Sequence, residues 1–398
     1  QAIGLETCVH CGMCAQACHY FVATQDAKYT PIRKLAPLRR VYHRELSPMR
    51  WLVRLVTRDI TAKELEDWQE LIYDSCTECG RCSMICPMGI HIAEMVGINR
   101  QAMAEAGLIP DELRVMQEGQ IEKGTIFEAD KDVLQYKVDE ISEKLGFKLP
   151  VDEHTAEVLV LTSGLDIMLF NDAMAGTAKI MHHIGAPWSF CTEAYESANF
   201  GLLSGHEDTQ RAASKKIIDT AVACGAKLIV TPECGHAFPS LRWEGAEMVG
   251  HELPFDVMSI SEYLGRQVMD GNLKLKKSPE KKVVALHDPC KVGRMGGSFA
   301  ESRAILDALG LDLHETPSNH QYNYCCGGGA GVFLINRASE LRQRAYEVKM
   351  SEIKTTGADR LVVSCGSCRL NFEVGKMKAH DTIEVDSLVA LVAENLAD

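Results

Sequence analysis

The residues best suited to chemistry are five cysteines in the last third of the chain. Five thiols are one more than a zinc ion or a cubane iron–sulfur cluster takes, since each of these has four protein ligands. Two of the five are adjacent, which suits bridging two irons better than chelating one small ion. The set therefore predicts an unusual iron–sulfur centre, to which the rest of the chain delivers electrons or from which it removes them. Its members are Cys290, Cys325, Cys326, Cys365 and Cys368.

Two further cysteine runs, in the N-terminal part of the chain, share the spacing C-x2-C-x2-C-x3-C. This is the bacterial ferredoxin spacing, in which a short loop wraps three thiolates around one cubane [4Fe-4S] cluster. The x3 step is expected to start a helix that carries the fourth cysteine to the other cluster. The spacing therefore predicts two cubanes with crossed ligands. Cys8, Cys11, Cys14 and Cys86 would hold the first, and Cys76, Cys79, Cys82 and Cys18 the second.

Zinc sites and disulfides are the alternatives for these thiols. Zinc motifs usually pair two C-x2-C units instead of running four cysteines together. Disulfides are frequent in small secreted proteins, whereas thirteen of the sixteen cysteines here occupy ligand-like positions in a long chain. We therefore predict metal ligation in a reducing compartment. His19 stands where the first run would usually carry proline, as the second does at Pro87, but neither residue is a ligand.

Composition narrows the class of protein further. The net charge of −13 argues against bulk nucleic-acid binding. A chain of 398 residues with 46% hydrophobic content can form two or three domains. No run of about eighteen apolar residues occurs, so we expect no helix of this chain to span a bilayer. We also expect no signal peptide at the start of the given sequence.

Residues 32–58 form a basic stretch in an otherwise acidic protein. Eight lysines and arginines occur there against one acid, Glu45, and apolar residues are interleaved with them. Such a segment could lie on an anionic membrane surface or on a partner subunit. The alternative is an ordinary helical face whose apolar side packs on its own domain.

Strands alternate with helices in the C-terminal two-thirds, which predicts parallel βα units. Residues 109–155 are polar and mixed, and we expect them to bridge two domains. Short apolar runs of buried-strand type occur at 158–162, 228–231, 283–286 and 360–364. Helical patterns occur at 91–107, 168–183, 208–224, 300–309 and 338–355.

The C-terminal two-thirds also contain an internal duplication. The first repeat keeps two of the five motif cysteines, and two thiolates cannot hold a four-iron cluster alone. We therefore predict that the first repeat has lost its cluster. The aligned pairs are Cys191 with Cys326, Cys234 with Cys368 and Phe190 with Cys325, while Leu165 is nearest to the position of Cys290.

Taken together, these motifs resemble those of the CCG-domain family of heterodisulfide reductase-type proteins over essentially the whole chain. The family pattern C…CCG…C-x2-C fits Cys290, Cys325-Cys326-Gly327 and Cys365-x2-Cys368. The resemblance implies a non-cubane [4Fe-4S] cluster on the five C-terminal cysteines. The layout of the chain resembles that of the D subunit of membrane-bound heterodisulfide reductase and of the K subunit of the dissimilatory sulfite-reduction-associated membrane complex. The degenerate first repeat is closer to the sulfite-reduction type and argues against double-cluster cleavage of a heterodisulfide.

The predicted fold class is α/β, with four segments along the chain. A mostly α-helical, two-[4Fe-4S] ferredoxin-like domain is expected at 1–108 and a linker at 109–155. The first, degenerate CCG repeat is expected at 156–275 and the second, cluster-binding repeat at 276–398. The two repeats are expected to be related by a pseudo-twofold axis.

The predicted function is that of an iron–sulfur catalytic subunit in a redox complex of anaerobic respiration. As in heterodisulfide reductases, electrons would move through the two cubanes to the non-cubane site, which would cleave or form a disulfide or trisulfide of a small molecule or small protein. The rival prediction is a non-catalytic electron-transfer subunit of a glycerol-3-phosphate, glycolate or lactate dehydrogenase complex linked to quinone. A purely structural scaffold is disfavoured by the thirteen ligand-like thiols.

The expected partners are other redox subunits, including a cytochrome b-type membrane subunit that supplies the spans this chain lacks. The expected location is cytoplasmic, peripheral on the inner face of the cytoplasmic membrane through that partner. We expect no nucleic acid, nucleotide or flavin, because no Rossmann or Walker pattern occurs. The glycine run 327–329 is expected to let the backbone approach a cluster, not to cradle phosphate.

Several side chains could donate a proton to a departing thiolate. His287 and Lys291 flank Cys290, His236 follows Cys234, and His320 precedes the Cys-Cys pair. Singly, each is more often a positioning or surface group than an acid. The remaining thiols, Cys191, Cys224 and Cys234, could face a substrate, although buried relics of a lost site are commoner.

Overall fold

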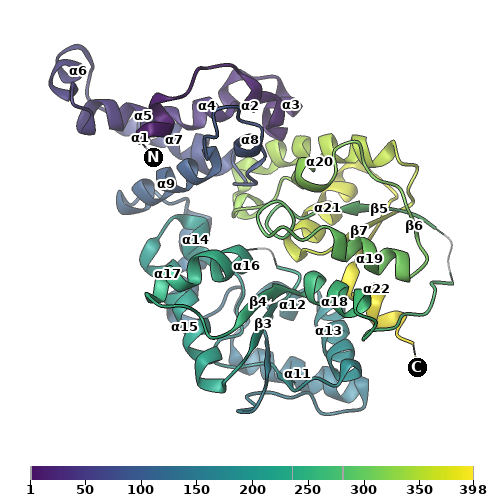
Figure 1. The fold of residues 1–398 in the computed structure, drawn as a ribbon. Coiled ribbons are helices and arrows are strands. Elements are labelled where there is room, and N and C mark those ends of the chain that lie inside the picture. The colour runs from purple at the N-terminus through teal and green to yellow at the C-terminus, as the bar shows by residue number, and fades with distance from the viewer. Residues whose placement is uncertain (1, 235, 280–281, 398) are drawn as a thin grey trace. The chain divides into compact units, whose positions relative to one another are not determined.

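The chain forms two compact units, and each draws on several stretches of sequence. The structure is a computed structural model that describes residues 2–234, 236–279 and 282–397 (Figure 1). The predicted boundaries of the four segments stay a prediction. Unit 1 comprises Gln1–Arg114, Leu202–Glu207 and Tyr324–Lys349, and unit 2 comprises Val115–Gly201, Asp208–Asn323 and Met350–Asp398.

Unit 1 is built from short helices, and the helix predicted at 91–107 is present as α9 (Ile92–Glu105). The basic stretch 32–58 is not one amphipathic helix but four short elements, because Pro37 and Pro48 interrupt it. The other elements wholly within unit 1 are α1 (Ala2–Glu6), α2 (Met13–Ala17), α3 (His19–Thr24), η1 (Ala27–Tyr29), α4 (Pro31–Lys34), α5 (Ala36–Val41), η2 (Tyr42–Leu46), α6 (Arg50–Val56), α7 (Ala62–Gln69), η3 (Glu70–Asp74), α8 (Arg81–Met84), η6 (Val332–Leu334) and η7 (Asn336–Ala338).

The two cysteine runs of unit 1 fold in the same way. In each, a glycine between the second and third cysteines adopts a left-handed conformation, with φ of 79° at Gly12 and 76° at Gly80. Only glycine adopts this φ without steric cost. A short helix starts directly after each glycine and includes the third cysteine, and α2 packs against α8. The helix thus begins before the x3 step and not, as expected, at it.

Unit 2 contains two four-stranded parallel sheets, which confirms the predicted α/β class. The strand orders are β2-β1-β3-β4 and β6-β5-β7-β8, so both sheets place the four strands of their segment in the same order. A pseudo-twofold axis between them stays a prediction. The strands are β1 (Val158–Val160), β2 (Trp188–Ser189), β3 (Leu228–Thr231), β4 (Asp256–Ser259), β5 (Val283–His287), β6 (Asp312–Leu313), β7 (Arg360–Val363) and β8 (Glu384–Ser387).

The edge strands and their helices escaped the sequence analysis. β4 (Asp-Val-Met-Ser) and β8 (Glu-Val-Asp-Ser) begin and end with polar residues, so neither shows the buried apolar run that identified β1, β3, β5 and β7. The helix expected at 168–183 is present and starts three residues later, at Asn171; a separate short helix ends at Met168. The helices wholly or mainly in unit 2 are α12 (Gly164–Met168), α13 (Asn171–Ile184), α15 (Glu207–Cys224), α16 (Ala237–Pro239), η4 (Ser240–Glu244), α17 (Gly245–Val249), α18 (Ile260–Met269), α19 (Ala300–Ala308), η5 (His320–Tyr322), α21 (Gly366–Ala379) and α22 (Leu388–Glu394).

Three further helices, α10 (Asp111–Lys123), α14 (Phe200–Ser204) and α20 (Ser339–Lys354), have residues in both units. Residues 109–155, read from the sequence as a polar bridge, contain α10 and α11 (Lys131–Leu145). The acid at Asp130 is the N-cap of α11, where its carboxylate accepts hydrogen bonds from two backbone N–H groups. Leu134, Val138 and Ile141 form the buried stripe of this helix.

The two sheets of unit 2 contribute to one hydrophobic core. The central strands supply Val160, Val230, Val284 and Val362, each fully buried. Helix α13 packs against α22 and α18 against α19. Since burial of apolar area is the main stabilising term in folding, this shared core fixes the strand ends that carry the cysteines.

A buried carboxylate should make the stability of unit 2 depend on pH. Burial raises the pKa of Glu196 to about 7, despite hydrogen bonds from Gly164 N and Ala198 N. The folded state keeps the proton up to about pH 7 while the unfolded state releases it near its usual value. The free energy of unfolding should therefore fall as pH rises through this window, by about 3 kcal/mol.

The test is to compare the unfolding temperature of the wild type and of Glu196→Gln between pH 5 and pH 8. The variant should lose the share of the decline that Glu196 contributes, while Asp166 and Glu233, whose pKa values burial also raises, to about 6 and about 8, should preserve the rest. Equal slopes for both proteins would show that another group titrates.

Candidate metal centres

Two cavities in unit 1 sort the eight N-terminal cysteines into two sets of four. One cavity encloses about 370 Å³ of space and is lined by Cys18, Cys76, Cys79 and Cys82. The other encloses about 550 Å³, counting the part open to solvent, and is lined by Cys8, Cys11, Cys14 and Cys86. Each cavity thus takes three cysteines from one loop and the fourth from the other.

The chemistry of these thiols fits a bound cation. All sixteen cysteines are free thiols, so no disulfide competes for them. Burial raises the pKa of Cys76 and Cys82 above the usual thiol range. A thiol in such a place becomes a thiolate only when a cation compensates its charge, and metal ligation does this.

Lys34 is a residue whose importance the sequence analysis missed. It was counted with the exposed basic stretch, but its side chain is buried, and its Nζ lies 3.4 Å from Cys18 Sγ and donates to the Ser75 carbonyl. Burial opposes its charge, yet the nearby Cys18, Cys76 and Cys82 sulfurs raise the pKa of Lys34. The only sequence signal was its position opposite apolar neighbours in α4.

Replacing Lys34 should change the redox behaviour of the adjoining centre. Removal of a buried positive charge disfavours addition of an electron, so Lys34→Met should lower the reduction potential of the cluster bound at Cys18, Cys76, Cys79 and Cys82. The measurement is an EPR-monitored redox titration. Lys28→Met is the control, because Lys28 pairs with Glu70 on the surface. An unchanged potential in Lys34→Met would contradict the assignment.

Arg100 ties distant stretches of unit 1 together. Its side chain is fully buried, and its guanidinium donates to Leu203 O at 2.6 Å, Ala330 O at 2.7 Å and Cys76 O at 2.8 Å. Its Nε lies 3.5 Å from Glu78 Oε1. One cation therefore satisfies carbonyls from the cysteine loop and from both later stretches of the unit.

Loss of Arg100 should destabilise unit 1 strongly. Arg100→Leu leaves three carbonyls without their donor and the Glu78 carboxylate without its ion-pair partner, which should cost about 3–5 kcal/mol of stability. Iron content and unfolding temperature of the anaerobically purified variant measure the effect. The exposed Arg33→Leu is the control, and equal values for the two variants would contradict the bracing role.

The Cys325–Cys326 pair lies in a turn of unit 1, packed on the N-terminal loops. Tyr20 is fully buried and its hydroxyl donates to Gly327 O at 2.9 Å. The Arg81 guanidinium lies 3.6 Å from the centre of the Tyr324 ring. Burial raises the pKa of Tyr20 far above its usual value, and Cys325, Cys76, Cys18 and Cys326 add to the shift. Tyr20 therefore lies close both to cysteines of the N-terminal runs and to the Cys325–Cys326 pair.

The glycine run beside this pair permits the close approach. Gly327 has a φ of 100°, and its N–H donates to Cys325 Sγ at 3.4 Å. A Cβ at Gly329 would lie 3.4 Å from the Thr77 carbonyl oxygen. Neither contact involves a phosphate-like cradle, which agrees with the expected use of these glycines in backbone approach.

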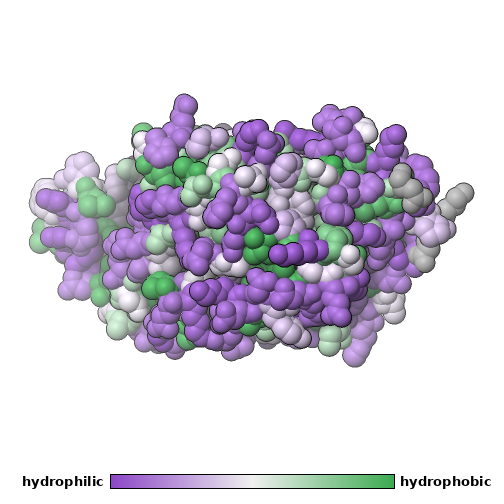
Figure 2. Space-filling view, turned by 90° about the horizontal axis from the view of Figure 1, so that it is seen from below, coloured by the Kyte–Doolittle hydropathy of each residue, from purple (hydrophilic) through white to green (hydrophobic). Residues whose placement is uncertain are grey.

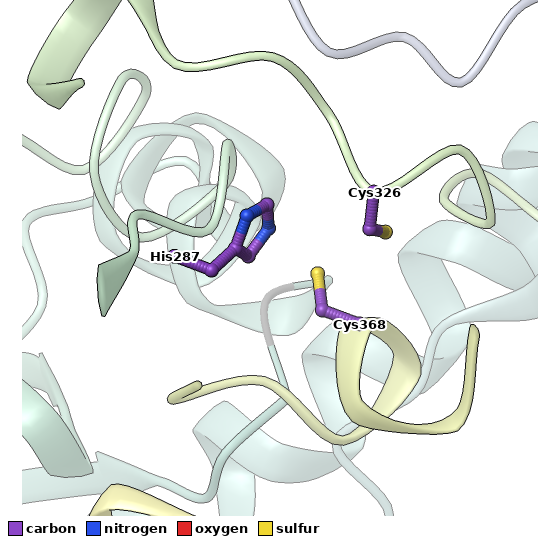
Figure 3. Close-up of side chains that lie close together, drawn as sticks. All are labelled: His287, Cys326 and Cys368. Atoms are coloured by element: carbon purple, nitrogen blue, oxygen red, sulfur yellow. The ribbon is translucent and has the colours of Figure 1, made fainter. Parts of the chain in front are cut away.

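The other three C-terminal cysteines belong to unit 2 and follow neighbouring parallel strands. Cys290 follows β5, and Cys365 and Cys368 follow β7, so all three lie at the carboxyl edge of one sheet. All three are buried. Cys368 Sγ and a ring nitrogen of His287 lie within 4.8 Å of each other (Figure 3), while Cys326, also labelled there, belongs to unit 1.

His287 is held firmly at the end of β5. It is fully buried, its ring meets that of Phe372 edge-on at 4.9 Å, and its Nδ1 lies 3.4 Å from Asn323 Nδ2. Lys291 is half-buried. His236 Nδ1 lies 3.7 Å from Cys234 Sγ, and both residues belong to the segment predicted as the first repeat. Of the proposed proton donors, His287 thus lies within reach of Cys368 of the five-cysteine set, and His236 lies within reach of Cys234.

Asp288 and Glu315 form a salt-bridge network with Arg303, which the backbone of His320 joins. Asp288 and Glu315 both pair with Arg303, and His320 N donates to Asp288 Oδ2 at 2.8 Å. Burial would raise the pKa of Asp288, but Arg303 outweighs it and lowers that pKa. With both carboxylates neutralised, the role of His320 is to anchor the turn through its backbone.

Glu233 directly precedes Cys234, the cysteine predicted to align with Cys368. The backbone oxygen of Glu233 accepts a hydrogen bond from Gly366 N, and its carboxylate accepts one from Val389 N at 3.1 Å. Burial raises the pKa of Glu233 to about 8 and that of Cys234 above the usual thiol range. The sequence analysis missed Glu233, although a carboxylate directly after a buried strand was the available signal.

Comparison with known families agrees with this arrangement of cysteines. Residues 4–90 match a 4Fe-4S dicluster domain, and residues 284–373 match the cysteine-rich CCG domain. The chain is an iron–sulfur protein of the CCG, heterodisulfide reductase D type. The predicted family is therefore confirmed, and with it the presence of iron–sulfur clusters in both parts of the sequence. The likeness to the sulfite-reduction K subunit stays a prediction.

Three relatives of this CCG protein align along nearly its whole length. The D subunit of a dihydromethanophenazine:CoB–CoM heterodisulfide reductase from Methanosarcina barkeri is 24% identical, over all of this chain and 95% of its own. An Hdr-like menaquinol oxidoreductase iron–sulfur subunit of Archaeoglobus fulgidus is 25% identical, over 92% of this chain and 75% of its own. The glycolate oxidase iron–sulfur subunit of Escherichia coli is 22% identical, over 96% of this chain and 93% of its own.

Proposed function

We propose that this chain is the catalytic iron–sulfur subunit of a multisubunit redox complex that cleaves or forms a disulfide or trisulfide. The observation that carries the proposal is the packing of the Cys325–Cys326 turn on the N-terminal cysteine loops, with Tyr20 against both. Electrons must tunnel between closely packed groups, so this packing supports transfer between the dicluster part and the CCG cysteines.

The ligand sets are part of the proposal. Cys8, Cys11, Cys14 and Cys86 would hold one cubane, and Cys18, Cys76, Cys79 and Cys82 the other. Cys290, Cys325, Cys326, Cys365 and Cys368 would hold a non-cubane [4Fe-4S] cluster. Bound there, the clusters supply single-electron transfer, and their thiolate ligation tunes the reduction potential.

The chain's own residues would position and protonate the sulfur substrate. Cleavage of an S–S bond takes two electrons, and each thiolate that leaves can take one proton. His287 is the best-placed donor, since its ring lies by Cys368 and is held by Asn323 and Phe372. Lys291 beside Cys290 is a second candidate, and His236 would serve the first repeat.

A non-catalytic role in a quinone-linked dehydrogenase is the second candidate. The relatives named as parts of a glycolate oxidase and of a menaquinol oxidoreductase favour it. In that case the five-cysteine centre would only relay electrons between a dehydrogenase and quinone. A cytochrome b-type partner and a peripheral place on the inner face of the cytoplasmic membrane belong to both proposals. No helix within the described part of the chain is long and apolar enough to cross a bilayer.

One experiment separates the two candidates. The chain is purified anaerobically, and EPR spectra of the five-cysteine centre are recorded with and without added thiol or disulfide. The catalytic proposal predicts that these compounds change the signal, and that Cys325→Ser abolishes thiol–disulfide turnover while the cubane signals persist.

Cys224→Ser provides the matched control, because Cys224 is a half-buried thiol outside the five-cysteine set. It should behave as the wild type. A signal unchanged by thiols, with no thiol–disulfide turnover in the wild type, would leave the relay role as the function. Full turnover in Cys325→Ser would contradict catalysis at the five-cysteine centre.

A further inference from the structure

The segment from η2 to α6 exposes an unusual amount of apolar surface. Trp51, Leu55 and Val56 are 66%, 75% and 77% exposed, and Leu46 and Met49 are similarly open. No residue of α6 is buried. The expectation that the apolar side of this basic stretch packs on its own domain is therefore wrong for α6.

Helix α6 turns its apolar side to solvent. At about 100° per residue, Trp51, Leu52, Leu55 and Val56 share an arc of roughly 140°. Arg50 and Arg54 lie on the opposite side. Arg54 pairs with Glu45 of η2 and donates to the Arg44 carbonyl at 3.3 Å, and Arg50 donates to the Glu45 carbonyl at 3.4 Å. A helix of a globular core has the reverse arrangement.

The surroundings of this apolar face are strongly basic. Residues 32–58 contain eight lysines and arginines against one acid, in a chain whose net charge is −13. Asp59 and Glu64 neutralise part of this charge through Arg44, Arg40 and Arg58. An excess of positive charge remains, because the eight cations of residues 32–58 outnumber Glu45, Asp59 and Glu64.

The position of α6 leaves the apolar face accessible. Figure 1 shows α6 at the end of the run formed by α5 and α7, at the upper left of the view. Figure 2 shows hydrophobic side chains among hydrophilic ones at that same left-hand end. The apolar side chains thus stand on a projecting tip, not in a groove that a second protein element would fill.

We propose that the η2–α6 tip, residues 42–58, inserts its apolar face into the interfacial region of an anionic lipid bilayer. Aliphatic residues with a tryptophan, flanked by arginines, are the composition of interfacial helices. Arginines near the surface attract anionic headgroups. This chain would make the contact with the lipid through its own residues. The proposal therefore does not depend on the proposed redox function or on a membrane partner.

The test uses the full chain, purified anaerobically, in flotation with protein-free vesicles. The wild type should float with vesicles of phosphatidylcholine and phosphatidylserine and bind much less to phosphatidylcholine alone. The double variant W51S/L55S should lower the apparent affinity by about tenfold or more, since two exposed large apolar side chains lose their burial in lipid. The triple variant R50E/R54E/R58E should abolish the preference for phosphatidylserine.

The control is M168S/L169S, which changes two exposed apolar residues of unit 2 and should bind as the wild type. Iron content equal to that of the wild type shows that each variant is folded. The proposal is overturned if the wild type does not bind protein-free anionic vesicles, even if it sediments with native membranes, because the tip would then dock on a protein. It is equally overturned if W51S/L55S binds as tightly as the wild type.

Discussion

A buried guanidinium organises unit 1, because a cation without water must find all its acceptors in the protein. Arg100 satisfies that requirement with carbonyls from the second cysteine loop, from Leu203 and from Ala330. These acceptors are far apart in the sequence. Their shared donor explains why residues 202–207 and 324–349 fold with the N-terminal part instead of with the sheets that precede and follow them.

The consequence for function is the position of the Cys325–Cys326 turn. Once Ala330 is fixed by Arg100, the turn before it meets the N-terminal loops through Tyr20 and through Tyr324 under Arg81. Gly327 adopts a φ of 100°, which favours glycine, and Gly329 lies against the Thr77 carbonyl. The cysteines near Tyr20 are Cys18 and Cys76, which belong to the second proposed cubane set. That set, and not the first, adjoins the CCG pair.

Local patterns in the sequence predicted those features that depend on local geometry. Cysteine spacing predicted the two cysteine loops, because three ligands of one cluster would come from one short loop. The apolar runs of β1, β3, β5 and β7 predicted the central strands. What depends on long-range packing was not visible. Lys34 could not be separated from the exposed arginines around it, and Arg100 looked like any helical arginine. The edge strands β4 and β8 contain too many polar residues to show a buried apolar run.

The central claim, that the second cubane set adjoins the CCG cysteine pair, can be measured by pulsed EPR. The quantity is the spin relaxation rate of the five-cysteine centre with the cubanes oxidised and then reduced, in the wild type, Cys11→Ser and Cys79→Ser. Reduction should speed the relaxation in the wild type and in Cys11→Ser, which perturbs the distant cubane, but not in Cys79→Ser. Loss of the effect in Cys11→Ser, with retention in Cys79→Ser, would contradict the account.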